Sequence, residues 1–199
     1  MSPAKRLAPA ASVIFAALLL AAPARAAILS VSPTASAIPV GGQFSVDILV
    51  TDVSDLFGFQ FDLAFDAGIL QFVGATRGDF LPVDVDSNGD PLDLFLALED
   101  GGSLLVADSR ACDVESDPGC TGISGDGRLA TLTFRGVQAG LSLLPPGDAL
   151  LVDPFLNLLE VETIGGTVEV SRVPEPSVPL LSLIGLAAAR FARRRLPAR

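Results

Sequence analysis

The chain has 199 residues, 50% of them hydrophobic, and a formal net charge of −10, a length typical of one ordinary domain. It contains no histidine, tyrosine or tryptophan, and Lys5 is its only lysine. These absences exclude a Ser-His-Asp triad, a histidine-rich zinc site and Schiff-base catalysis on lysine. Carboxylate chemistry remains, but it normally needs a deep cleft in a larger scaffold. We therefore expect a protein that is not an enzyme.

Residues 1–26 have the organisation of a secretory signal peptide. Lys5 and Arg6 give a positive start, an apolar run extends from Leu7 to Ala22, and Ala24-Arg25-Ala26 is a small-residue cleavage site. The alternative is a transmembrane helix, but the run is short and the cleavage site follows directly. We predict export, with a mature body that begins at Ala27.

The body is strongly acidic. From Ala27 to Pro176 it carries five arginines against all 23 acidic residues, a net charge of −18. Such a field repels nucleic acid and anionic lipid surfaces, so we expect no nucleic-acid partner. Most of these carboxylates are expected to form a solvated surface, which favours solubility and also suits divalent cations.

Alternation at period two predicts β-strands throughout the body. The clearest is Phe57–Phe65, a stripe of five apolar residues in which each buried phenylalanine contributes about 1.5–3 kcal/mol, so this strand should be central. The other predicted strands are Ile28–Ser32, Phe44–Thr51, Ile69–Gly74, Leu92–Leu98, Leu104–Asp108, Leu129–Arg135, Ala149–Val152 and Val161–Val170, the last interrupted at Gly165-Gly166. About nine short strands, separated by turns and without helical periodicity, predict an all-β fold, an antiparallel jelly-roll β-sandwich.

Two shorter motifs lie in predicted loops. Asp84-Val85-Asp86-Ser87-Asn88-Gly89-Asp90 matches the first half of a calcium loop, with oxygen ligands from Asp84, Asp86, Asn88 and Asp90 and a further carboxylate from Asp93. Phe95 stands where a bidentate glutamate is expected, and the alternative is an Asn-Gly turn between two strands. Ca²⁺ is thus the one candidate cofactor.

The two cysteines, Cys112 and Cys120, enclose seven residues that include Asp117-Pro118-Gly119. In an exported protein this spacing predicts a disulfide that holds a surface loop and contributes about 2–3 kcal/mol at best.

Residues 173–199 differ in composition from the acidic body and form a separate segment. Pro174-Glu175-Pro176 favours an extended linker, an apolar run follows from Val178 to Ala189, and the chain ends in an arginine cluster. The apolar run is shorter than the ~20 residues of a simple spanning helix. The arginines are expected to stay cytoplasmic, which places the acidic body beyond the inner membrane.

This tail resembles the PEP-CTERM sorting signal of Gram-negative bacteria, on the match of Pro174, Glu175 and Pro176 with the cluster Arg193, Arg194 and Arg195. The resemblance implies an exosortase as processing partner, transient anchoring in the inner membrane and a final location at the cell surface or outside the cell. Pro179 within the short apolar segment departs from the pattern. The alternative is an ordinary C-terminal anchor or a weakly amphipathic tail.

Residues 27–172 are similar to cohesin domains. The similar segments are Gly41–Phe44, Gly58–Asp66 followed by Leu70–Val73, and Gly125–Phe134, while Asp84–Asp93 and Cys112–Cys120 resemble loop insertions. Cohesins are nine-stranded jelly-roll sandwiches, related to carbohydrate-binding modules, that dock a dockerin module on one flat sheet face. The resemblance implies a non-catalytic module that binds a dockerin-like or other surface protein, or extracellular polysaccharide. The alternatives are a structural component of an exopolysaccharide matrix without a discrete protein ligand, and a small carboxylate glycosidase.

Overall fold

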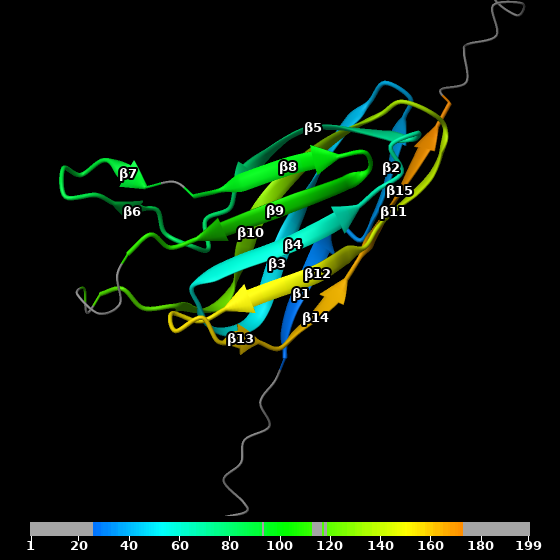
Figure 1. The fold of residues 1–199 in the computed structure, drawn as a ribbon. Helices are drawn as coiled ribbons and strands as arrows, with labels where there is room; N and C mark the ends of the chain where they lie inside the picture. Colours follow the sequence, from blue (N-terminus) through cyan, green and yellow to red (C-terminus); the bar gives the residue numbers. More distant parts are fainter. Residues whose placement is uncertain (1–25, 93, 113–116, 118, 173–199) are drawn as a thin grey trace, which may run out of the picture.

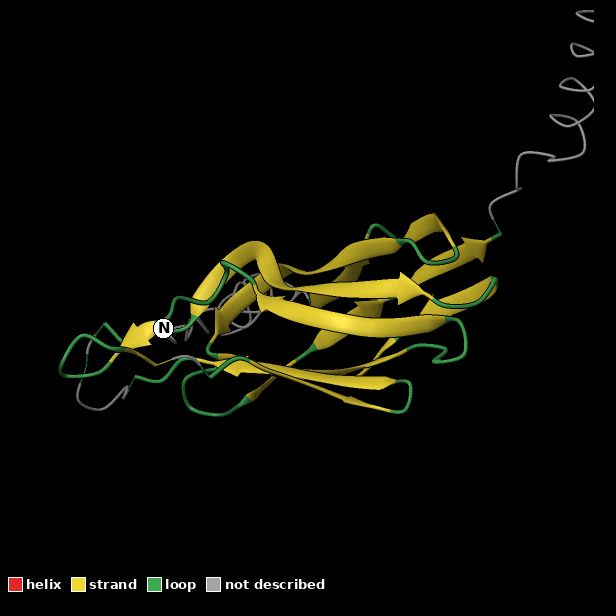
Figure 2. Ribbon diagram, turned by 90° about the horizontal axis from the view of Figure 1, so that it is seen from above, coloured by secondary structure: helices red, strands yellow, loops and turns green. Residues whose placement is uncertain are grey.

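The computed structural model describes residues 26–92, 94–112, 117 and 119–172. Every regular element in these residues is a strand, and the strands form two packed layers (Figures 1 and 2). This confirms the predicted all-β sandwich. Because the described residues contain no helix, none of them provides a helical membrane span. The predicted signal peptide, apart from Ala26, and the tail lie outside the described residues.

One layer, which we call the β3 sheet, has five strands in the order β14-β1-β3-β10-β5. Its strands are β14 (Val161–Ile164), β1 (Ala27–Ser32), β3 (Gln43–Leu56), β10 (Ile123–Gly136) and β5 (Leu70–Arg77). The pairs within it are antiparallel except for β1 and β14, which run parallel.

The facing layer, which we call the β4 sheet, has the order β13-β12-β4-β9-β8 and is antiparallel throughout. Its strands are β13 (Leu158–Leu159), β12 (Pro146–Val152), β4 (Gly58–Ala64), β9 (Ser103–Ser109) and β8 (Leu96–Asp100). The central position of β4 is the one predicted from its apolar stripe.

Two smaller sheets complete the described part. β11 (Gly140–Leu144), β15 (Gly166–Ser171) and β2 (Ala35–Pro39) form a three-stranded sheet in which β15 and β2 are parallel. β6 (Asp84–Val85) and β7 (Pro91–Leu92) form a hairpin that projects from one end of the sandwich (Figure 1).

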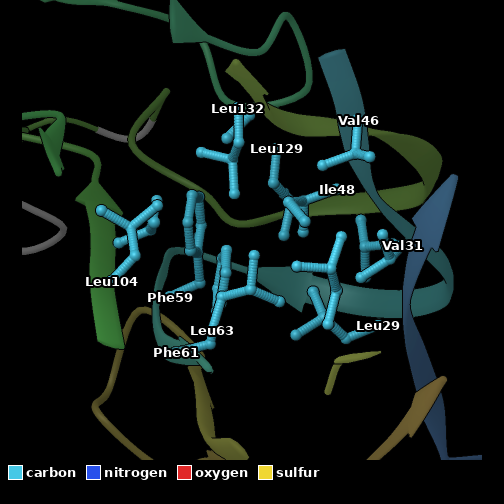
Figure 3. Close-up of a cluster of buried hydrophobic side chains, with 14 of the residues drawn as sticks. Leu29, Val31, Val46, Ile48, Phe59, Phe61, Leu63, Leu104, Leu129 and Leu132 are labelled. Atoms are coloured by element: carbon cyan, nitrogen blue, oxygen red, sulfur yellow. The ribbon is translucent and has the colours of Figure 1, made fainter. Parts of the chain in front are cut away.

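The core lies between the two large sheets and is filled by alternate residues of both. Phe59, Phe61 and Leu63 of β4 pack toward Leu29 of β1 and Ile48 of β3 (Figure 3). Phe61 and Leu63 are fully buried, whereas Phe57 precedes β4 and is only half-buried. The predicted stripe is therefore confirmed over four of its five residues.

Four of the described strands have no counterpart in the predicted set: β2, β11 and the two-residue strands β6 and β13. In β2 only Ile38 gives an apolar signal before Pro39 ends the segment. In β11 the pattern is misleading, because Leu141 and Leu143 are exposed while Ser142 is buried. The predicted strand Leu92–Leu98 is divided between β7 and β8, and the described part has 15 strands rather than about nine.

Candidate functional site

The predicted calcium loop forms the turn of the β6–β7 hairpin. Oδ1 of Asp86 accepts hydrogen bonds from the backbone N–H groups of Asn88 (2.8 Å) and Asp90 (2.9 Å). These hydrogen bonds hold the pKa of the Asp86 carboxyl group below its usual value. The N–H of Gly89, whose φ of +86° favours glycine, donates to the carbonyl of Asp86. The motif thus builds the Asn-Gly turn that was the alternative reading.

Asp84 is directed to different partners. Its oxygens accept hydrogen bonds from Nη2 of Arg110 (2.7 Å) and from the backbone N–H of Ala111 (2.7 Å). Partial burial opposes ionisation of Asp84, but these hydrogen bonds outweigh it and hold the pKa of its carboxyl group below the usual value. The ion pair therefore ties the hairpin to the segment that follows β9.

The structure brings three of the predicted calcium ligands, Asp86, Asn88 and Asp90, into one turn. Asp84 turns to Arg110 and Ala111 instead, and Asp93 lies outside the described residues. Nowhere in the described part do three acidic or cysteine side chains cluster closely enough to hold a metal ion. Calcium binding at Asp84, Asp86, Asn88, Asp90 and Asp93 remains a prediction.

The predicted disulfide between Cys112 and Cys120 is confirmed. Cys120 is buried, and Arg110 donates a hydrogen bond to the carbonyl of Thr121 next to it (2.5 Å). The disulfide therefore adjoins the residues that anchor the β6–β7 hairpin. The sorting residues Pro174, Glu175, Pro176, Arg193, Arg194 and Arg195 lie outside the described residues.

The feature that the sequence analysis missed is the outer face of the β4 sheet. Because Phe61 and Leu63 of β4 point inward, the residues paired with Gln60 and Asp62 point outward. Many of these outward positions are apolar, and we call them the apolar face: Leu96 and Leu98 of β8, Leu105 and Ala107 of β9, Leu150 of β12 and Leu158 of β13. The exposed fractions of Leu96, Leu98, Leu150 and Leu158 are 42%, 54%, 46% and 69%.

The apolar face also contains a shallow groove of about 290 Å³. Gly58, Leu94 and Leu150 line this groove, and a Cβ atom at Gly58 would lie 3.0 Å from Cβ of Ser109. Polar residues share this face: Gln60 and Asp62 of β4 point outward, and Asp100 of β8 and Asp148 of β12 are exposed. Because β4 is the central strand, Gln60 and Asp62 lie between the leucines of β8 and those of β12 and β13.

The outer face of the β3 sheet has the opposite character. Ser45 and Thr133 share a hydrogen bond between their hydroxyl groups (2.9 Å), and the Thr131 hydroxyl donates to Asp47 (2.5 Å). A hydroxyl-rich outer face is what a solvated antiparallel sheet normally shows. The leucines on the β4 sheet are the exception, and exposed apolar patches of this kind mark interaction surfaces.

A sequence feature does indicate this exception. Leu104-Leu105-Val106-Ala107 and Ala149-Leu150-Leu151-Val152 are continuous apolar runs rather than alternating ones. Continuous runs are typical of strands that are covered on both faces. The structure covers only one face of each strand, so the second apolar face has no partner among the described residues.

Comparison with solved structures identifies the architecture. A non-cellulosomal cohesin from Archaeoglobus fulgidus superposes with a TM-score of 0.57 at 20% identity, covering 79% of this chain and 98% of that one. The cohesin CaCohA2 from Clostridium acetobutylicum gives 0.58 at 20% identity, covering 78% and 94%. A type I cohesin from Clostridium thermocellum, solved in the complex Coh-OlpA-Doc918, gives 0.57 at 14% identity, covering 74% and 100%.

The fold is that of cohesin domains. This confirms the part of the predicted resemblance that concerns architecture. No protein-family model and no curated protein matches the sequence. At 14–20% identity, the likeness to cohesins establishes the fold, but it does not assign a role to any residue of this chain.

Proposed function

We propose that this chain is an exported surface protein whose cohesin-like sandwich is a non-catalytic module that docks a dockerin-like protein on the apolar face. The observation that carries the proposal is the set of exposed leucines on the β4 sheet, Leu96 and Leu98 at one edge and Leu150 and Leu158 toward the other. The type I cohesin from C. thermocellum with the same fold was solved in complex with a dockerin. The carboxylates of Asp62, Asp100 and Asp148 add a requirement for basic residues on the partner.

The face is large enough in energetic terms to contribute to a specific complex. Full burial of a leucine side chain is worth about 1.5–3 kcal/mol, so covering four half-exposed leucines supplies roughly 3–6 kcal/mol. A micromolar complex requires about 8 kcal/mol. The remainder, together with the entropic cost of association, would be offset by ion pairs with Asp62, Asp100 and Asp148 and by polar contacts at Gln60 and Ser109.

A binding role also agrees with the carboxyl groups of the structure. A glycosidase acid needs a carboxyl group whose pKa is raised. The pKa values of Asp84, Asp86 and Asp153 are all lowered, the last chiefly by a hydrogen bond from the side chain of Asn157. These three groups stay ionised at neutral pH and are unsuited to donate a proton.

The test is affinity capture from the organism's own secreted proteins, with the purified full chain immobilised. We expect the wild type to retain a discrete protein. The double variant Leu98→Glu/Leu150→Glu should retain at least tenfold less of that protein. The matched control is Thr76→Glu, which places a new charge at an exposed position of β5 in the other sheet. Retention of no discrete protein, or equal retention by both variants, would refute the proposal.

We also propose that the ends of the chain act as export and sorting labels, with removal of residues 1–26 and exosortase processing of the tail. β1 begins at Ala27 and β15 ends at Ser171, so both steps would leave every described strand intact. Mass spectrometry of the surface fraction should find an N-terminus at Ala27 and a chain that ends near Pro176. A full-length chain in the cytosol would contradict this.

A further inference from the structure

A second groove lies on the outer face of the β3 sheet, on the opposite side of the sandwich from the apolar face. Its volume is about 470 Å³, within the range of roughly 300–1,000 Å³ that is typical of ligand sites. Three segments line it: Asp47, Leu49 and Thr51 of β3; Asp126, Gly127 and Arg128 of β10; and Asp79 after β5.

A β-bulge in β10 directs the polar side chains into this groove. Leu49 pairs with Arg128 and Ile48 with Ala130, so Leu129 is an extra residue, and both Leu129 and Ala130 are buried. The extra residue reverses the alternation of β10. Arg128 therefore lies on the same outer face as Thr131 and Thr133, which is the re-aiming of side chains that bulges produce.

Two glycines allow the wall of the groove to close on β10. The N–H groups of Gly78 and Phe80 donate to the carbonyls of Leu129 (2.8 Å) and Arg128 (3.1 Å). A Cβ atom at Gly78 would overlap the carbonyl of Arg128, and one at Gly127 would overlap the ring of Phe80. This close approach places Asp79 beside the guanidinium group of Arg128.

Hydrogen bonds hold the carboxyl groups of Asp126 and Asp47, and the guanidinium group of Arg128 has one donor without a partner in the described part. Oδ1 of Asp126 accepts a hydrogen bond from the N–H of Asp52 (2.8 Å), and Asp47 is held by Thr131. The Nε atom of Arg128 is buried and has no hydrogen-bond partner among the described residues. Its Nη2 atom lies 3.8 Å from Asp79, beyond hydrogen-bond distance. The Arg128 side chain as a whole is 43% exposed, so its guanidinium group still presents donors to a ligand in the groove.

We propose that this groove binds a neutral polysaccharide. Carboxylates of Asp47, Asp79 and Asp126 accept hydrogen bonds from sugar hydroxyl groups, and Arg128 donates to them, so the groove offers both acceptors and donors to a polyol. Leu49 provides an apolar floor for the C–H face of a sugar ring. The net charge of −18 between Ala27 and Pro176 disfavours polyanions. A neutral polyol can meet both the carboxylates and the arginine by hydrogen bonds alone.

The site is independent of protein docking, because it lies on the other sheet. A chain with both sites links a protein partner on the apolar face to a polysaccharide on the β3 sheet. Either site can fail without the other, and the experiment separates the two.

The test is affinity gel electrophoresis of the purified full chain in gels that contain dextran, hydroxyethyl cellulose, xyloglucan or galactomannan, with alginate and chitosan as charged comparisons. We expect at least one neutral polymer to retard the protein, and Arg128→Gln to weaken that retardation at least tenfold. The matched control is Arg135→Gln, which removes the same charge from an exposed position of β10 and should leave binding unchanged. Leu98→Glu should also leave it unchanged.

A second variant tests the groove without the risk that a loss of binding comes from misfolding. The side chain of Asp79 is 78% exposed, so Asp79→Asn should keep the melting temperature while it weakens retardation. The proposal is overturned if no neutral polymer retards the protein, if only a charged polymer does, or if Arg135→Gln and Arg128→Gln reduce binding equally.

Discussion

A buried ion pair between the two sheets offers the sharpest test of the fold. Nε of Arg77 in β5 lies 2.6 Å from Oδ2 of Asp108 in β9, and the two side chains are 11% and 1% exposed. Removing one partner of such a pair leaves a charge in a poorly solvated place and costs about 3–5 kcal/mol. We expect Asp108→Leu and Arg77→Met each to lose that amount, which for a body of this size lowers the melting temperature by roughly 6–20 °C.

The double variant Arg77→Met/Asp108→Leu shows whether the loss in the single variants comes from an uncompensated buried charge. Apolar replacement of both partners removes the uncompensated charge, so the double variant should lose far less than the sum of the single variants. Urea denaturation followed by circular dichroism measures all four proteins, and Asp79→Asn at the exposed pair with Arg128 is the control, with an expected change below about 1 kcal/mol. Losses below about 1 kcal/mol in both single variants, or simple additivity, would refute the reasoning.

Three further predictions concern the loops. Replacing Cys112 and Cys120 by alanine should lower the free energy of unfolding by about 2–3 kcal/mol, the value for a short closed loop, and an unchanged urea midpoint would contradict this. Because the pKa of Asp86 is lowered in the folded state, its ionised form stabilises the protein above the unfolded pKa of about 3.9 and loses this effect as the pH falls through the lower folded value. The stability advantage of the wild type over Asp86→Asn should therefore be full at pH 6 and shrink steadily as the pH falls below about 3.9. A difference that does not change with pH would contradict the assignment. A calcium site at Asp84–Asp93 predicts heat on titration with Ca²⁺ that Asp86→Ala removes, and calorimetric silence from both proteins would eliminate it.

The sequence predicts well those features that depend on local periodicity. The apolar stripe of β4, the Asn-Gly turn offered as the alternative at Asn88 and the pairing of Cys112 with Cys120 all arise from residues close together in the chain. The core position of Asp108 could also have been found. It continues the inward alternation of Leu104 and Val106, and a carboxylate at such a position implies a buried partner.

The two candidate binding faces depend on long-range pairing, which periodicity does not provide. The apolar face requires that β8, β9, β4 and β12 lie side by side in a register that aligns Leu98 with Leu105. The groove on the β3 sheet requires the bulge at Leu129 and the contact of Gly78 with β10. A bulge shifts every following side chain to the other face, and nothing in the alternation of β10 alone marks which residue is extra.

The central claim, docking on the apolar face, is tested most directly by site-specific photocrosslinking in the producing cells. A benzoylphenylalanine residue is placed at Leu98 on the β4 sheet, or at Thr76 on the β3 sheet as control. We predict a discrete protein adduct from position 98 and none from position 76. Adducts from neither position, or from position 76 alone, would contradict the account.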